Sequence, residues 1–427
     1  MRILTLLLLF ITFFFAAEIR IATFNVENLF DGKNHGTEYR DFEISRNSNW
    51  NNERYQKKSK AISNLIKELN ADIISLQEIE NKSVIKRLAK ESGYKYYAFR
   101  KPKNSPLGVG LMSKIPIKKT SYYDIKGVRT RDILKSDFEF EGVNFSIFGV
   151  HFLSQKNEKR YKIKEVSTLL NLSNKVDNSI LIGDFNAEIK PLSILAPLNK
   201  THKNLWSLLL NFRHTSHISG RAIDHIYISR NFEGLTPKKL EVYKDTKKLS
   251  DHYPVIATFS TKSSNINTQK IDALADIYEL ESFLEPLNFQ NLAVTYTDKY
   301  GFAVSQQEGR GIYVYDKDSG LNIGDIVDIT IYGLERFYGN LQVKEYTLDR
   351  VKKERANLEN FLKPNLVSAK FGDTVASVSG DLRGIYLYIN NDKIRVYSKN
   401  RELADGKVTF ENVLLVEYNG QKELLVR

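Results

Sequence analysis

The hydrophobic pattern of the chain changes its period near residue 262, and this change restricts the fold more than any other feature of the sequence. Before it, apolar runs at 19–24, 72–77 and 179–183 predict strands, and amphipathic stretches at 52–69 and 159–174 predict helices. Beyond residue 278 the runs are short, rich in Tyr, Val and Ile, and separated by Gly turns. We therefore expect an α/β (α+β) unit followed by an all-β part. Further elements are expected as a helix at 83–92 and strands at 109–113, 133–140, 143–152, 222–229 and 255–260.

The length of 427 residues exceeds what one compact core usually accommodates, so several domains are expected. Between the predicted α/β unit and the predicted all-β part lies the polar stretch KSSNINTQK, which has no apolar period and predicts a linker. Five strands at 292–297, 301–306, 311–315, 325–334 and 341–348 predict a small β-barrel, and a weaker copy follows. The expected division is a signal peptide at 1–17, the α/β unit at 18–262, a linker at 263–277, a barrel at 278–350, a linker at 351–364 and a second barrel at 365–427.

The net charge and the cysteine content restrict the expected class of binding partner and the types of site that the chain can form. The 63 Lys and Arg residues exceed the 51 Asp and Glu residues by 12, which favours a polyanionic partner. The chain has no cysteine, so disulfides, thiolate metal sites, a cysteine nucleophile and a lipid anchor on Cys are excluded. No protein partner can be inferred.

The first 17 residues have the pattern of a signal peptide. Met1 and Arg2 precede an apolar run at 3–15 that ends in Ala16 and Ala17. The run is shorter than the roughly 20 residues that cross a bilayer, so no stable membrane anchor is expected. The predicted location is secreted or periplasmic, with an uncleaved anchor or a buried first strand as alternatives.

Polar residues stand at the ends of six apolar strands. Asp184 and Asn186 follow the strand in SILIGDFN, and their spacing of two places both side chains on one side. Asp224 lies within a strongly β-forming run, where a carboxylate needs a partner, and His252 directly precedes another strand. Taken singly, each position is as well explained by a turn or a strand terminus. Four more polar residues lie at the ends of apolar strands in the same way: Asn25, Glu78, His151 and Asp251.

With these motifs, FNVEN, LQE, GDFN, IDHI and SDHYP in this order, the chain resembles the endonuclease/exonuclease/phosphatase superfamily over about residues 19–260. The resemblance implies a four-layer α/β sandwich with the site at one edge of two central sheets. It also implies phosphodiester hydrolysis by an activated water, with Mg²⁺ as cofactor and Mn²⁺ or Ca²⁺ as alternatives.

The resemblance also assigns a role to each matching residue. His252 would be the general base, oriented by Asp224. Asp184 would orient the water or a second metal, and Asn186 and His151 would bind the phosphate. The predicted metal ligands are Glu78, Asn25 and Asp251. Arg131 resembles an arginine that contacts the substrate backbone in nuclease members, although a solvated charge explains it nearly as well.

One stretch departs from the pattern of the deoxyribonuclease I branch. Those members carry a carboxylate that pairs with the histidine matching His151, near the strand matching 109–113. This chain has the residues NSPLG at 104–108. A leaving-group role for His151 is therefore in doubt, while phosphate binding is not.

The strands after residue 278 resemble an oligonucleotide/oligosaccharide-binding (OB) barrel of the kind fused to secreted bacterial nucleases. Such barrels stack the bases of single strands on aromatic side chains in a basic groove. The candidates for stacking are Phe302, Tyr313, Tyr315, Phe337 and Tyr338, although barrels also need aromatic residues in their cores.

The expected function is thus a secreted Mg²⁺-dependent nuclease acting on DNA, RNA or both. A lipid or inositol phosphodiesterase or phosphatase with the same site is the alternative, and an exposed aromatic hairpin for membrane entry would favour it. A non-catalytic binding protein on the same fold would have lost site residues, and none of the main set is missing.

Overall fold

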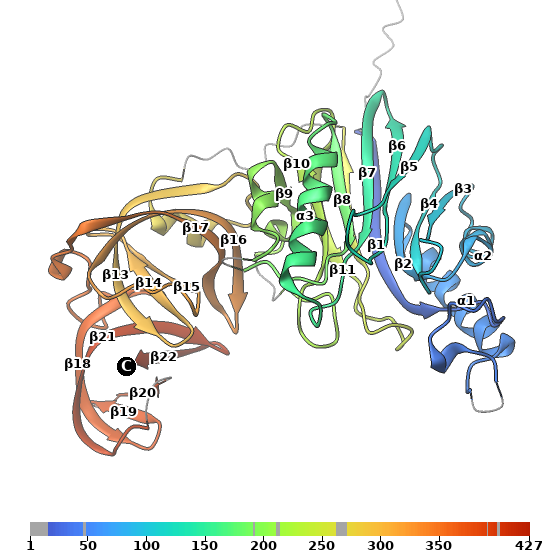
Figure 1. Ribbon diagram of the computed structural model, residues 1–427. Coiled ribbons are helices and arrows are strands. Elements are labelled where there is room, and N and C mark those ends of the chain that lie inside the picture. Colours follow the sequence, from blue (N-terminus) through green and yellow to red (C-terminus); the bar gives the residue numbers. More distant parts are fainter. Residues whose placement is uncertain are drawn as a thin grey trace, which may run out of the picture.

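A computed structural model describes residues 16–45, 48–190, 193–210, 214–261, 271–390, 392–398 and 402–427 (Figure 1). The predicted signal peptide lies outside these residues except for its last two, and most of the predicted linker at 263–277 also lies outside them. Within the described part, no helix is long and apolar enough to cross a membrane.

Two six-stranded sheets form the centre of the N-terminal unit. The first has the order β11-β12-β1-β2-β4-β3 and the second the order β5-β6-β7-β8-β10-β9. The strands of the first sheet are β1 (Glu18–Leu29), β2 (Ile73–Ile79), β3 (Tyr96–Arg100), β4 (Gly108–Ser113), β11 (Thr236–Val242) and β12 (Val255–Ser260). Those of the second are β5 (Lys119–Tyr123), β6 (Ile133–Phe140), β7 (Val143–His151), β8 (Ser179–Asp184), β9 (His202–Asn204) and β10 (Asp224–Ser229).

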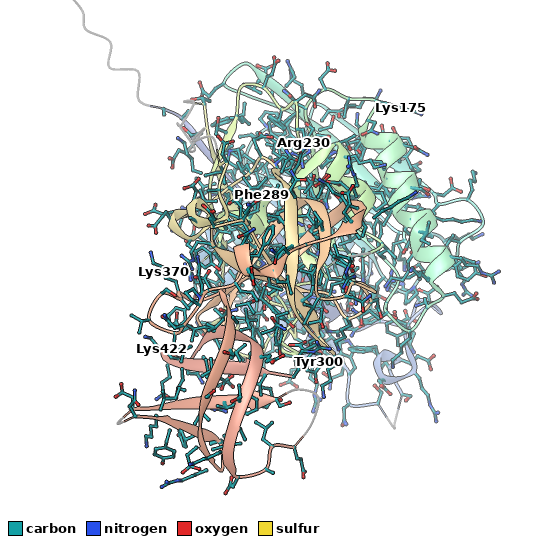
Figure 2. The ribbon with its side chains drawn as sticks, turned by 90° about the vertical axis from the view of Figure 1, so that its left-hand side faces the viewer. Lys175, Arg230, Phe289, Tyr300, Lys370 and Lys422 are labelled. Atoms are coloured by element: carbon teal, nitrogen blue, oxygen red, sulfur yellow. The ribbon has the colours of Figure 1, made fainter. Side chains whose placement is uncertain are left out.

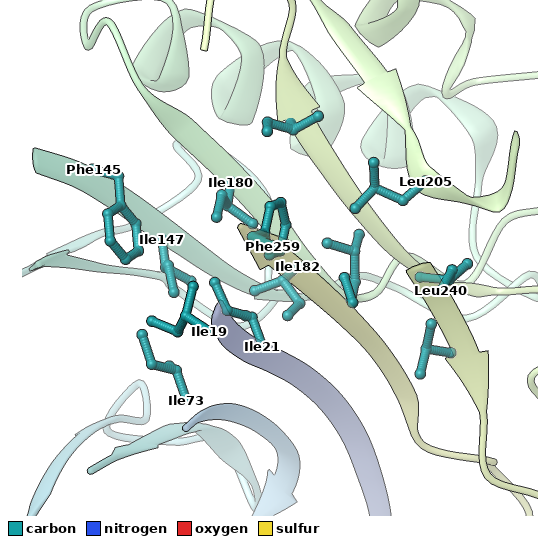
Figure 3. Close-up of a cluster of buried hydrophobic side chains, with 14 of the residues drawn as sticks. Ile19, Ile21, Ile73, Phe145, Ile147, Ile180, Ile182, Leu205, Leu240 and Phe259 are labelled. Carbon is teal, nitrogen blue, oxygen red and sulfur yellow. The ribbon is translucent and has the colours of Figure 1, made fainter. Parts of the chain in front are cut away.

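The main core lies between the two sheets. Alternate residues of β1, such as Ile19 and Ile21, face Ile147, Ile180 and Ile182 of the second sheet (Figure 3). Since strand side chains alternate between faces, the other set of apolar residues points outward and needs a helical cover. Both sheets therefore have helices on their outer faces.

Three α-helices provide these outer layers. Helices α1 (Asn52–Leu69) and α2 (Lys82–Ser92) pack on the first sheet, and α3 (Lys159–Ser173) packs on the second. Asn51 caps α1 by accepting a hydrogen bond from the amide of Arg54, and Asn81 caps α2 in the same way. The order helix, sheet, sheet, helix confirms the predicted four-layer sandwich.

Two closed five-stranded barrels follow the sandwich, which confirms the expected change to an all-β architecture. The first has the order β13-β14-β15-β17-β16 and the second the order β18-β19-β20-β22-β21, so the two have the same topology. Their strands are β13 (Leu287–Asp298), β14 (Gly301–Ser305), β15 (Gly311–Tyr315), β16 (Asp325–Phe337), β17 (Asn340–Arg355), β18 (Thr374–Arg383), β19 (Tyr386–Ile389), β20 (Asp392–Ser398), β21 (Gly406–Tyr418) and β22 (Gln421–Val426).

Short 3₁₀ turns connect the larger elements. They are η1 (Arg40–Phe42), η2 (Ala196–Lys200), η3 (Leu205–Leu208), η4 (Leu274–Glu279) and η5 (Leu358–Asn360). The turns η2 and η3 lie where the sandwich meets the first barrel. There Asn199 donates a buried hydrogen bond to Glu345 (2.8 Å), and Leu210 packs into the barrel's apolar core.

The two barrels also contact each other through equivalent turns. The turn at Tyr338 and Gly339 lies against the turn at Tyr418 and Asn419, and the amide of Asn419 donates to the carbonyl of Tyr338 (2.8 Å). The rings of Tyr338 and Tyr418 have centroids 4.8 Å apart. Figure 2 shows the barrels from the side, with Tyr300 labelled near their junction.

Candidate active site

The topology brings strand ends from both sheets to one edge of the sandwich. Strands β7 and β8 run parallel, and their last residues, His151 and Asp184, are paired in register. Strand β10 is antiparallel to β8, so its first residue, Asp224, lies opposite Asp184. In the first sheet, β12 is antiparallel to β1, and the segment before it, which carries His252, therefore lies beside the end of β1 and Asn25.

His252 and Asp224 form a buried hydrogen-bonded pair. His252 Nδ1 lies 2.8 Å from Asp224 Oδ2, and the hydroxyl of Ser216 donates to the same oxygen at 2.7 Å. Burial alone would lower the pKa of His252, but the carboxylates of Asp224, Asp184 and Asp251 outweigh it and raise the pKa to about 10. Asp224 thus fixes the ring orientation and leaves Nε2 directed toward Asp184, at 3.8 Å.

The carboxylate of Asp184 accepts several hydrogen bonds at this edge. Its Oδ2 accepts from the side chains of Asn25 (3.1 Å) and Asn186 (3.2 Å), and its Oδ1 accepts from the amide of Asn186 (2.8 Å). Gly183, the residue before Asp184, allows β8 to lie close to Val150 of β7. A Cβ at this position would lie 2.0 Å from the carbonyl oxygen of Val150, and the residue has a φ of 141°. Burial raises the pKa of Asp184.

Three carboxylates gather beside the His252 pair. Glu78 lies at a β-bulge of β2 with a φ of 65°, and Asn25 donates to its Oε1 (3.1 Å). Glu27 accepts from the amide of Asp251 (3.1 Å), and its pKa is raised by burial and by the nearby carboxylate of Asp251. The ammonium of Lys58 interacts with Glu27, Glu78 and Asp251.

This group fits a hard divalent cation. Its donors are carboxylate and amide oxygens, which Mg²⁺ prefers, and their crowding is unfavourable without positive charge. Asn25, Glu78 and Asp251 were all predicted as ligands, and the structure places them together. Glu27 was not predicted, although its position two residues after Asn25 on the same strand is a signal that points to it.

His151 lies beside this group, next to Asp184 and Glu78. Its Nε2 is 3.6 Å from Asp184 Oδ2 and 3.8 Å from Glu78 Oε1. Its Nδ1 is buried and has no hydrogen-bond partner among the described residues. Burial lowers the pKa of His151 well below its usual value.

Arg131 lies at the rim, beside His151 and Glu165, and it hydrogen-bonds to the hydroxyl of Tyr39. Behind the site, α3 contributes two buried residues that were not predicted. Lys162 donates to the carbonyl of Asn186 (3.2 Å), and Glu165 accepts from the amide of Leu153. The sequence predicted only an amphipathic helix over this stretch, and nothing in that pattern distinguishes these two residues from other polar residues of a helix.

All nine predicted site residues thus lie at one edge of the sandwich. A histidine paired with a buried aspartate lies opposite a second aspartate and beside an oxygen-rich acidic group, an arrangement that could activate a water and hold a divalent cation.

Residues 20–211 match the family model described as "Endonuclease/Exonuclease/phosphatase family". This match supports a phosphoesterase activity of the hydrolase type.

The chain is similar to several solved structures at low identity. An endonuclease/exonuclease/phosphatase family protein from Bacteroides thetaiotaomicron is 15% identical, with coverage of 58% of this chain and 100% of that chain and a TM-score of 0.43. The human Nocturnin catalytic domain with bound sulfate is 17% identical, with coverage of 57% and 94% and a TM-score of 0.44. A mannosyl-6-phosphatase from B. thetaiotaomicron is 14% identical, with coverage of 56% and 99% and a TM-score of 0.41. The curated proteins contain no match to the chain.

Proposed function

We propose that the protein is an exported, Mg²⁺-dependent nuclease that hydrolyses phosphodiester bonds of DNA or RNA with a water activated by His252. The observation that carries this proposal is the position of His252 Nε2. It is held by Asp224 on one side and faces Asp184 across 3.8 Å. A water between these two groups would donate one proton to His252 and be oriented by Asp184.

The remaining site residues have roles that follow from their positions. Glu78, Asp251, Glu27 and Asn25 would hold Mg²⁺. A bound divalent cation would neutralise charge on the phosphate oxygens and offset the carboxylate field around His252. Asn186 and His151 would donate hydrogen bonds to the phosphate, and Arg131 would contact the neighbouring phosphate of the strand.

An aromatic cavity favours nucleic acid over a lipid or inositol phosphate. It has a volume of about 730 Å³ and lies where both barrels meet the loop at Ser219 to Ala222 of the sandwich. Tyr338 and Phe337 line it and are 44% and 38% exposed, so they are available for stacking on bases. The same loop reaches the active site, because Arg221 donates to Gln155 (2.5 Å) and Ser216 bonds to Asp224.

Acidic and basic residues line this cavity in nearly equal numbers, and two of the basic residues form ion pairs there. Lys344 pairs with Glu335 (3.0 Å) and Arg395 with Glu423 (2.9 Å). The cavity is therefore better suited to bases than to phosphates. Of the other predicted stacking residues, Tyr315 and the nearly buried Tyr313 also line the cavity, whereas Phe302 is fully buried in the core of the first barrel.

The test is a substrate panel. Purified full-length protein is incubated with plasmid, single-stranded DNA, RNA, sphingomyelin and an inositol phosphate, with Mg²⁺ or EDTA. We expect Mg²⁺-dependent cleavage of a nucleic acid and no cleavage by His252→Ala. Turnover of sphingomyelin or the inositol phosphate, with nucleic acids intact, would instead support the alternative function.

A further inference from the structure

A second cluster of titratable residues lies away from the proposed catalytic group. Asp31 lies just beyond the end of β1, Glu80 directly follows β2, and His35 lies on the loop between β1 and α1. One potential ligand atom from each lies within 4.8 Å of those of the other two. Asp31 and Glu80 are 7% and 0% exposed, so neither is an ordinary surface carboxylate.

The hydrogen bonds of Glu80 leave one of its oxygens unsatisfied. Its Oε2 accepts from the amide of Asp31 (2.6 Å) and the side chain of Asn81 (3.3 Å). Its Oε1 is buried and receives no hydrogen bond from the part of the chain that the structure describes. A buried carboxylate oxygen without a donor is costly and calls for a missing positive group.

Glu38 supplies a further carboxylate to the same place. Its carboxyl group faces that of Glu80 at hydrogen-bonding range, although neither group is a donor when ionised. The amides of Gly36 (2.8 Å) and Thr37 (3.0 Å) hold it in position. Two facing carboxylates require a proton or a cation between them.

The kind of cation follows from the donor set. His35 Nε2 lies 3.1 Å from Asp31 Oδ2, so an imidazole is part of the cluster. Mg²⁺ and Ca²⁺ favour all-oxygen sites, whereas carboxylates combined with an imidazole suit Zn²⁺ or Mn²⁺. The side chain of Asn81, which donates to Asp31 Oδ2 (3.0 Å), would orient one ligand from behind.

We propose that Asp31, His35 and Glu80, with Glu38 beside Glu80, form a binding site for a divalent transition-metal ion, of which Zn²⁺ is the probe of choice, separate from the proposed Mg²⁺ site. The ion would join the ends of β1 and β2 to the loop between β1 and α1. That loop carries Tyr39, which hydrogen-bonds to Arg131 at the rim of the active site. The site would therefore hold the loop in the position from which it supports Arg131.

The experiment measures Zn²⁺ bound to the full-length protein by equilibrium dialysis in a large excess of Mg²⁺, which competes for oxygen-only sites. We expect the wild-type protein to retain one Zn²⁺ per chain and to gain melting temperature when it binds. His35→Ala and Glu80→Gln should weaken Zn²⁺ binding at least about 100-fold, since even outer-shell changes cost 10- to 100-fold. Glu43→Gln, an exposed carboxylate of the same loop, is the matched control and should bind normally.

Two variants separate loss of the proposed site from misfolding and from Zn²⁺ binding elsewhere. His35 is partly exposed, with 44% of its side chain accessible, so His35→Ala should fold even if Glu80→Gln does not. His217, Asp251 and His252 form another cluster that could take Zn²⁺, so His217→Ala is included and is expected to retain the ion. No retained Zn²⁺ in the wild type, or loss in His217→Ala with retention in His35→Ala, would overturn the proposal. Neither result depends on whether the protein cleaves nucleic acid.

Discussion

Replacing Asp224 with asparagine should remove most of the activity while leaving the fold in place. Asp224 lies 2.8 Å from His252 Nδ1 and is 1% exposed, so its charge acts on the imidazole with little screening. The positive charge that His252 develops on accepting a proton would lose its partner. The asparagine side chain would keep the shape of the aspartate and an acceptor for Ser216.

The loss in kcat depends on two contributions, the hydrogen bond between Asp224 and His252 and the attraction between their charges. A hydrogen bond to a charged group contributes about 1.5–3 kcal/mol. Two unit charges about 4 Å apart interact by about 4 kcal/mol at an effective dielectric constant of 20. Since each 1.36 kcal/mol is a tenfold change in rate, we expect kcat to fall about 10- to 1,000-fold.

The assay is initial-rate hydrolysis of a small phosphodiester at saturating Mg²⁺. KM should change little, because Asp224 acts through His252 and not on the substrate. Asp245→Asn, an exposed aspartate, is the matched control and should keep wild-type kcat. A folded Asp224→Asn protein with kcat within about threefold of wild type would refute the base assignment.

Three further predictions concern Mg²⁺ binding, the binding of a single strand by the barrels, and the buried His202. Glu78→Gln should raise the Mg²⁺ concentration for half-maximal activity at least about tenfold, and an unchanged titration would remove Glu78 from the ligand set. Tyr338→Ala should weaken binding of a long single strand by about 1–3 kcal/mol without altering turnover of a small phosphodiester, whereas Tyr96→Ala should leave both unchanged. His202 is buried and its pKa is lowered to about 4, so the folded protein binds fewer protons than the unfolded chain and stability falls as the pH drops from about 6.5 to 4. The loss from this residue is about 3 kcal/mol, and a folded His202→Asn protein with the same acid profile in chemical denaturation would contradict it.

The sequence predicted the elements that have strong periodicity or caps. Helix α1 was expected at 52–69 and has these bounds, because Asn51 caps its start and Asn70, with a φ of 47°, ends it. Strand β15 likewise has its predicted bounds, Gly311–Tyr315. Strands β5 and β11 were not predicted, since their partly exposed, Lys-containing sequences have no apolar run. Strand β18 was missed as well, because Ser, Gly and Asp residues interrupt its short apolar run.

The site was predictable where polar residues interrupt buried strands. Asp184, Asp224 and His252 each stand next to an apolar run, and that contrast is visible in one sequence. Ser216, Lys162 and Glu165 lie on a loop or a helix, where polar residues are ordinary, so only the fold shows that they support the site. The cavity between the barrels and the sandwich could not be predicted, because it depends on how separately folding parts meet.

The pairing of β1 with β12 has a consequence for engineering the sandwich. Ala17 and Thr261 exchange hydrogen bonds, so the two ends of this unit lie side by side. They lie at the opposite end of β1 and β12 from Asn25 and His252, as the register of the two strands requires. A short peptide could therefore join residue 17 to residue 261, and the chain could be opened at an exposed turn such as Glu141 and Gly142. Such a circular permutant would retain every strand and would place both new termini away from the catalytic edge.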